Sequence, residues 1–206
     1  MKAHAIFGEK SGKDRADELF EYCIKHLINS AGKDDLYRIF YYDCKPLGKK
    51  INHPLGQRQI DLSKTPLYKN KMEFLDAMMR KRKVALRLGR LADEYANYML
   101  KPAAVKALAN GKRTVADLKD EDFFYDVKQK GVDMKIGIDI ASMAYKHQVD
   151  RMVLIAGDSD FVPAAKLARR EGIDFILDPM GNHINLDLME HVDGITTKIP
   201  KDKISK

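Results

Sequence analysis

Hydrophobic residues along the chain follow two rhythms, one typical of buried strands and one typical of amphipathic helices. Residues 3–7 are a short apolar run that ends at a glycine and charged residues, which predicts a buried strand followed by a loop. Apolar residues at helical spacing then predict a helix that ends before Gly32 and is capped by Asp14 or Asp17. Residues 36–42 are rich in aromatic side chains and predict a second strand.

The middle of the chain alternates between turn-forming and periodic stretches. Residues 45–66 contain several prolines and glycines and predict a long loop, after which a helix is expected over residues 67–82. Residues 84–90 fit either a strand or a continuation of that helix. A further helix is expected over residues 102–111, between a proline and a glycine, and residues 114–126 are an acidic and aromatic stretch that we interpret as helical.

The carboxy-terminal third has the clearest pattern. Helices are expected at residues 133–147 and 160–171, and continuous apolar strands at residues 151–156 and 173–177. Such alternation is typical of a parallel sheet covered on both faces, so we predict a doubly wound, mainly parallel α/β fold. In these sheets binding sites form beyond the carboxyl ends of strands. Chemistry is therefore expected just after Phe7, Asp43, Ala156 and Leu177.

Length and composition agree with one globular domain. The chain has 206 residues, of which 45% are hydrophobic and 33% charged, so we expect a single domain over residues 1–200 and a basic tail at 201–206. We expect no membrane span, because no apolar run approaches the required length. The two cysteines, Cys23 and Cys44, do not form a CxxC pair, which favours reduced thiols and a cytoplasmic location.

Positive charge is concentrated in one part of the chain. Between residues 45 and 113 there are 17 basic and 5 acidic side chains, although the net charge of the whole chain is only +7. We interpret this as a basic, mostly helical insertion at about 45–124 in an otherwise acidic domain. Such a segment attracts phosphate backbones, although a solvated surface without a partner is an equally good explanation of the charges alone.

Two carboxylates follow the apolar strand at residues 151–156. Asp158 and Asp160 come directly after it, where both side chains can point into one crevice. Oxygen ligands of this kind suit Mg or Mn, which also bridge to phosphates. The alternative for Asp160 is a helix cap.

A second acidic pair, Asp133 and Asp139, occurs on the preceding helix. Asp133 can be a cap, and Asp139 can pair with Lys135 one turn earlier. The two aspartates are about 120° apart around a helix and do not share a face. We therefore predict Asp133 as a metal ligand and Asp139 as nearby support.

Two stretches of the chain carry distinctive acidic motifs. Residues 128–139 contain Lys-Gly-Val-Asp and a second aspartate six residues later, and residues 153–163 contain Gly-Asp-Ser-Asp-Phe. These motifs resemble the NYN domain family, which includes LabA-like bacterial proteins and belongs to the PIN-like nuclease superfamily. The combination is far more specific than a single Asp-x-Asp. The resemblance covers about residues 1–44 and 125–200.

The resemblance implies a Rossmann-like, PIN-like sheet and an acidic cluster that holds Mg or Mn for the hydrolysis of RNA phosphodiester bonds. It places the metal on Asp133, Asp158 and Asp160, with Asp139 close by as a further catalytic carboxylate. The partner implied is RNA, in single-stranded form, and a homo-oligomer stays open. Candidate phosphate contacts are the basic residues Lys81, Arg82, Lys83, Arg87 and Arg90.

The first strand departs from the family pattern. The family ends this strand with Asp-Gly-x-Asn, whereas here Phe7 stands in place of the aspartate and Lys10 in place of the asparagine. Either Glu9 or Asp14 replaces the lost ligand, or Lys10 fills the vacancy with a positive charge and also contacts nucleic acid. The second reading corresponds to a catalytically degraded RNA-binding or regulatory module.

A third hypothesis is a partner protein that docks through a methionine-rich surface. Met72, Met78 and Met79 are close together on the helix expected at 67–82. Methionines at helical spacing more often belong to a core, and we favour that explanation.

Overall fold

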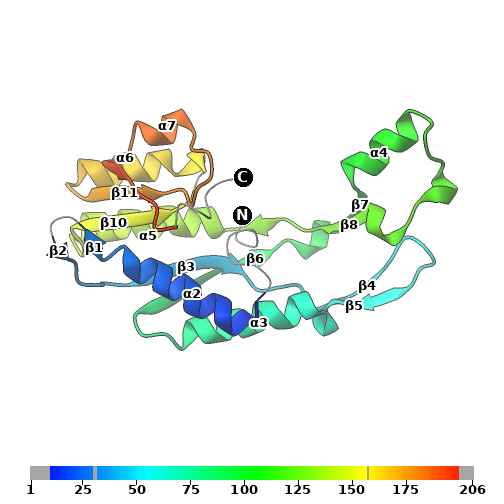
Figure 1. Ribbon diagram of the computed structural model, residues 1–206, viewed down its shortest axis with the longest axis horizontal. Helices are drawn as coiled ribbons and strands as arrows, with labels where there is room; N and C mark the ends of the chain where they lie inside the picture. Colours follow the sequence, from blue (N-terminus) through cyan, green and yellow to red (C-terminus); the bar gives the residue numbers. More distant parts are fainter. Residues whose placement is uncertain (1–9, 30–31, 157, 200–206) are drawn as a thin grey trace.

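The structure is a computed structural model that describes residues 10–29, 32–156 and 158–199. It has a body of parallel strands and helices from which an arm extends (Figure 1). The strand expected at residues 3–7 lies outside the described residues, as do Phe7 and Glu9.

The first sheet of the body has three strands. β3 (Ile39–Cys44) and β6 (Val84–Leu91) are parallel neighbours, and β9 (Gln129–Lys130) pairs antiparallel with the end of β6. The helix α3 (Pro66–Met79) provides the crossover between the parallel strands. Its first turn is capped by Thr65, whose hydroxyl accepts a hydrogen bond from a backbone N–H.

Helices cover both faces of this sheet. Successive strand residues point in opposite directions, so each strand packs against helices on both sides. Tyr41 of β3 packs against the cluster formed by α3 and α2 (Gly12–Lys25). Tyr42 packs on the other face, against the core that contains α5 (Val132–Tyr145). Residues 84–90 are therefore a strand, with alternating sides directed to α3 and to α5.

The cap of α2 differs from the expectation. The helix is capped by Ser11, whose hydroxyl accepts a hydrogen bond from the backbone N of Asp14 at 3.1 Å. Asp14 and Asp17 were the expected caps, but both lie inside the helix. Asp14 stabilises its first turn, where a negative charge is favourable.

The second sheet also has three strands. β10 (Arg151–Ile155), β11 (Asp174–Asp178) and β12 (Gly194–Ile195) are parallel neighbours, and α6 (Val162–Arg170) connects the first two. The core between this sheet and the helices contains wholly buried apolar residues: Ala144, Ala165, Ala168, Phe175, Leu177, and Leu188 from α7 (Leu186–Met189). β1 (Ile28–Asn29) and β2 (Gly32–Lys33) form a small antiparallel pair.

The arm extends to one side of the body (Figure 1) and contains antiparallel strand pairs and a helix. β4 (Lys50–Asn52) pairs with β5 (Gln59–Asp61), and β7 (Asn97–Leu100) pairs with β8 (Phe123–Asp126). The helix α4 (Pro102–Ala109) lies beyond β7.

Aromatic rings hold the two strand pairs of the arm together. The ring of His53 is buried, and its centre lies 4.8 Å from that of the Tyr98 ring and 5.4 Å from that of the Phe123 ring, both edge-on. Tyr98 also contacts Tyr125 edge-on, with centroids 5.1 Å apart. These contacts provide the arm with a small core of its own.

Three expectations for the middle of the chain need correction. Residues 45–66 are not one loop, because they contain β4, β5 and the 3-10 turn η1 (Leu62–Lys64). Residues 114–126 form no α-helix: the side chain of Asp117 accepts hydrogen bonds from Thr114 and closes a 3-10 turn, and the aromatic run after it pairs as β8. The stretch 45–124 is not a mostly helical insertion, because it contains β6 of the first sheet.

The described residues show an α/β fold with two parallel units. The parallel pairs β3–β6 and β10–β11 belong to separate sheets within the described part of the chain, so one continuous doubly wound sheet is not observed there. The methionines of α3 do not share a surface: Met78 is wholly buried, whereas 61% of Met79 is exposed.

Candidate functional site

The turn after β10 carries two of the predicted carboxylates, and both are exposed. The carboxylate of Asp158 accepts a hydrogen bond from the backbone N of Asp160 at 3.1 Å. This bond stabilises the 3-10 turn η5 (Ser159–Phe161). Because α6 is capped at Phe161, Asp160 does not cap that helix.

Asp133 lies in the first turn of α5 and is also exposed. The helix starts after Gly131, whose positive φ of 79° lets the chain turn sharply from β9 into α5. η5 packs against α5. Since α5 runs back toward the beginning of β10, its first turn faces the end of β10, where the acidic turn lies.

A close backbone contact fixes the start of α5. A Cβ at Gly89 of β6 would lie 2.6 Å from the carbonyl oxygen of Lys130 and 2.8 Å from the side chain of Val132. No side chain fits there. The first sheet and the beginning of the helix that carries Asp133 therefore touch directly.

Asp139 is half-buried and bound to the first sheet. Its carboxylate accepts hydrogen bonds from the Tyr42 hydroxyl at 2.9 Å and from Arg87 Nε at 2.8 Å. The guanidinium of Arg87 also lies over the Phe40 ring, 5.1 Å from its centre. Burial, and then the bond to Asp139, raises the pKa of Tyr42. Arg87, not Lys135, is therefore the ion-pair partner of Asp139 among the described residues.

The predicted metal ligands suit Mg or Mn in type but not in position. Asp133, Asp158 and Asp160 offer exposed carboxylate oxygens, which hard cations prefer. However, within residues 10–29, 32–156 and 158–199 no three acidic, histidine or cysteine side chains come together to hold a metal ion. The described residues thus do not by themselves form a complete metal site.

Three predicted phosphate contacts lie at the amino end of a strand. Lys81, Arg82 and Lys83 precede β6 in the first sheet, whereas Asp158 follows the carboxyl end of β10 in the second sheet. The Lys81 ammonium donates a hydrogen bond to Asp17, and that of Lys83 donates to a backbone carbonyl. Arg82 is exposed.

The remaining predicted cations have carboxylate partners. Lys10 pairs with Glu18 on α2. Arg90, near the carboxyl end of β6, pairs with Glu94 at 3.1 Å. Arg87 pairs with Asp139, as described above. Of the predicted phosphate contacts, Arg90 lies nearest in the chain to the carboxyl end of its strand.

A buried polar cluster that was not predicted lies at the end of β11. Asp178 is wholly buried and accepts hydrogen bonds from His26 Nε2 at 2.8 Å, the backbone N of Met180 at 2.7 Å, and the Tyr22 hydroxyl. The strand-end rule indicated this position. Its partners Tyr22 and His26, in and directly after α2, could not be predicted, because the spacing of apolar residues does not indicate which polar side chains meet.

A similar ion pair lies at the end of β3. Asp43 accepts hydrogen bonds from the Lys71 ammonium and, at 2.6 Å, from the Tyr41 hydroxyl. The backbone N of Cys44 donates to its other oxygen at 2.7 Å. At this strand end, which was expected to carry chemistry, the negative charge of Asp43 is thus neutralised by Lys71.

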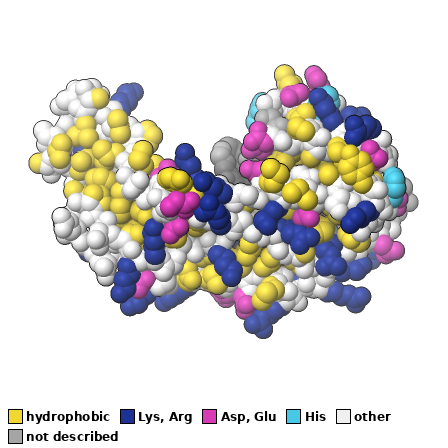
Figure 2. Space-filling view, turned by 180° about the vertical axis from the view of Figure 1, so that it is seen from behind, with side chains coloured by type: hydrophobic (Ala, Val, Ile, Leu, Met, Phe, Trp, Pro, Cys, Tyr) yellow, Lys and Arg dark blue, Asp and Glu magenta, His cyan; other side chains and the backbone are white. Residues whose placement is uncertain are grey.

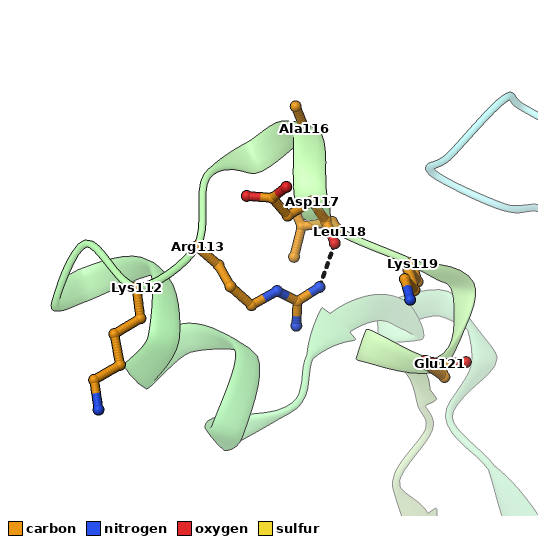
Figure 3. A pocket seen from close by; sticks show the side chains of 7 residues that line it. All are labelled: Lys112, Arg113, Ala116, Asp117, Leu118, Lys119 and Glu121. Atoms are coloured by element: carbon orange, nitrogen blue, oxygen red, sulfur yellow. Dashed lines mark hydrogen bonds between the residues drawn. The ribbon is translucent and has the colours of Figure 1, made fainter.

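The arm contains a pocket distant in the chain from the acidic turn (Figure 3). The guanidinium of Arg113 points into it but is bound to Asp122 by two hydrogen bonds of 2.9 and 2.6 Å. Those bonds lower the pKa of Asp122 to about 2. We interpret this pocket as structural. Its lining comprises Lys112, Arg113, Ala116, Asp117, Leu118, Lys119 and Glu121.

Parallel strands with crossover helices, and exposed carboxylates beyond a strand end, are features of a PIN-like α/β domain. The NYN domain family matches residues 20–194. The chain belongs to this family, which confirms the resemblance seen in the sequence. Members of the family are known for nuclease and ribonuclease activity, generally with divalent metals.

No curated protein and no solved structure matches the chain. Across the part of the chain that the structure describes, no helix is both long and apolar enough to cross a membrane.

Proposed function

We propose that the protein is a metal-dependent ribonuclease that hydrolyses RNA phosphodiester bonds at the edge formed by Asp133, Asp158 and Asp160. One observation supports this more than any other. The three exposed carboxylates of the family motifs lie in the first turn of α5, just before η5 and within η5, and η5 packs against α5. In this proposal they are the candidate ligands of Mg or Mn.

Asp139 acts in this proposal as a positioning residue. Its carboxylate accepts hydrogen bonds from Tyr42 of β3 and Arg87 of β6, so it fixes α5 against both parallel strands of the first sheet. The beginning of α5, with Asp133, is thereby held at the carboxyl edge.

A divalent cation supplies charge neutralisation and an acidified water to hydrolysis of this kind. Since no complete metal site is found among the described residues, we assign no step of the reaction to a bound ion. The metal requirement is instead the quantity that the first experiment measures.

Purified protein with manganese is expected to cleave labelled single-stranded RNA, and chelation of the metal is expected to stop cleavage. Asp158→Asn removes one negative charge and one strong oxygen donor from the acidic turn. It is expected to lower the cleavage rate by about tenfold or more. Calorimetric titration with manganese, on both proteins, measures binding separately from cleavage.

The matched control is Asp150→Asn. Asp150 is also exposed and lies just before β10, at the end of that strand opposite to Asp158. Asp150→Asn removes one negative charge, as Asp158→Asn does. Its cleavage rate is expected to equal that of the wild type. Intact RNA in the presence of manganese and of magnesium would refute the proposal.

A second candidate function is RNA binding without hydrolysis. Two observations favour it: Arg87 neutralises Asp139, and Phe7 replaces the acidic residue that the family places at the end of the first strand. Both reduce the negative charge with which a cation would be held.

If the protein only binds RNA, its affinity is expected to be independent of divalent metal ions and to depend on the salt concentration. Raising the salt from about 50 to about 200 mM is expected to weaken binding by about tenfold or more, because phosphate contacts release counterions. Fluorescence anisotropy with labelled RNA, with and without a chelator, measures both effects. Binding that needs manganese, or that does not respond to salt, would contradict this alternative.

We further propose a cytoplasmic location. Cys23 and Cys44 are both unpaired thiols in the structure, and Cys44 is buried. This state fits a reducing compartment.

A further inference from the structure

A short neck of chain joins the arm to the body and carries an exposed tyrosine beside a lysine. We define the neck as residues 90–97 and 126–130. Tyr95, in the 3-10 turn η2 (Asp93–Tyr95), has 71% of its surface exposed. The ammonium nitrogen of Lys130 lies 4.9 Å from the centre of the Tyr95 ring. The ring is thus held beside a cation but has most of its surface open to solvent.

A second cation lies beside Lys130. Arg90 of β6 is directly opposite Lys130 in the strand register. Both approach the carboxylate of Glu94, at 3.1 Å for Arg90 and 4.0 Å for Lys130. All three side chains are more than 40% exposed. Ion pairs so exposed contribute little to stability, so a phosphate can take over both cations at low cost.

The neck leads directly into the acidic edge. Lys130 precedes Asp133 by only three residues, which limits the distance between their Cα atoms to about 10 Å. The contact of Gly89 with Lys130 and Val132 keeps this spacing short. Figure 2 shows a hollow between the arm and the body, with Lys and Arg side chains gathered at its border. The neck joins the two parts that flank this hollow.

We propose that the neck is a binding element for single-stranded RNA, in which a base stacks on Tyr95 and the neighbouring phosphates bind Lys130 and Arg90. The inference rests on the RNA-directed function proposed above and adds the residues that hold the unpaired strand. Aromatic rings next to cations are the usual means of holding unpaired strands. A base inside a duplex cannot stack on Tyr95, because its neighbours cover both of its faces.

Substitution of the tyrosine tests the stacking contact. In fluorescence anisotropy with labelled single-stranded RNA and a chelator present, Tyr95→Ala is expected to weaken binding by about tenfold, as loss of one base stack does. Tyr95→Phe keeps the ring and is expected to bind like the wild type. Because Tyr95 is exposed, thermal unfolding of both variants is expected to match that of the wild type.

Tyr145 offers a matched control at the other end of α5. It is 56% exposed, and its hydroxyl accepts a hydrogen bond from the guanidinium of Arg170 at 3.4 Å, so it too is a surface tyrosine beside a cation. About 20 Å of helix separates it from Asp133. Tyr145→Ala is expected to leave RNA binding unchanged.

The salt dependence of binding separates the stacking contact from the phosphate contact. Lys130→Gln is expected to reduce the slope of log affinity against log salt by about 0.7, the value for one phosphate contact on a single strand. Tyr95→Ala is expected to leave the slope unchanged. An RNA with abasic positions is expected to bind wild type and Tyr95→Ala equally, since it has no base to stack there.

Either of two results would overturn the inference. In the first, Tyr95→Ala binds normal RNA as tightly as the wild type does. In the second, Tyr95→Ala loses as much affinity for abasic RNA as for normal RNA. Duplex RNA bound with the same dependence on Tyr95 would also contradict it. Tyr95-dependent binding without any cleavage would refute hydrolysis alone. Cleavage that is unaffected by Tyr95→Ala, with unchanged binding, would refute the neck alone.

Discussion

Asp178→Ala is expected to lower the free energy of unfolding by about 3–5 kcal/mol. Asp178 is wholly buried and accepts hydrogen bonds from Tyr22, His26 and the backbone N of Met180. The substitution leaves all three donors without this acceptor in a site closed to water, and each unsatisfied donor costs free energy. Urea denaturation, followed by circular dichroism, measures the change.

Because of the Asp178 carboxylate, the stability of the protein is expected to depend on pH. Burial alone would raise the pKa of Asp178, but the hydrogen bonds from His26, Tyr22 and Met180 outweigh it and hold the pKa below its usual value of 3.8. A lowered folded-state pKa contributes stability above the unfolded pKa, and this contribution is lost as the pH falls through the folded value. Acidification below pH 3.8 is therefore expected to reduce the stability difference between wild type and Asp178→Asn.

Asp174→Ala is the control for the buried carboxylate. Asp174 lies at the other end of β11 and pairs with Arg151, but its side chain is 38% exposed. Its loss is expected to cost no more than about 1 kcal/mol. Equal effects of the two substitutions would show that the burial of Asp178 is not what makes it important.

Gly12→Ala is expected to destabilise the protein by about 3 kcal/mol. Gly12 lies where α2 crosses α3, and a Cβ there would be 2.2 Å from the carbonyl oxygen of Asn70 and 2.6 Å from the backbone N of Phe74. Both neighbouring atoms are backbone, so they cannot rotate away, and the two helices must separate. The midpoint of urea denaturation measures the loss.

Gly137→Ala provides the opposite result on a matched position. Gly137 lies inside α5, and no atom outside its own helix turn comes within 4 Å of an added Cβ. The substitution is expected to stabilise the protein by about 0.5–1 kcal/mol, because alanine is the better helix former. A loss of stability in both variants would contradict the explanation by close approach.

Where one physical signal dominated, the sequence predicted the fold well. Continuous apolar runs identified β10 and β11, and helical spacing identified α3 and α5. The arm was predicted poorly, because its short strands are held by contacts between distant aromatic rings. The ring of His53 packs on Tyr98 and Phe123, a contact that no local pattern contains.

The candidate site stays a prediction. The family motifs and the rule of strand ends indicated Asp133, Asp158 and Asp160, and the structure shows that these three side chains are exposed, with η5 packed against α5. Charge counting could not show which cations already have partners. The ion pair between Arg87 and Asp139, for example, joins residues 52 positions apart, so it depends on the tertiary fold alone.

The contact at Gly89 makes the spacing between β6 and the start of α5 depend on a single position. Any side chain there would push Lys130 and Val132 outward together. The cation beside Tyr95 and the first turn with Asp133 would then be displaced in the same direction. For the proposed function, a substitution at Gly89 would therefore change RNA binding at the neck and the position of Asp133 together.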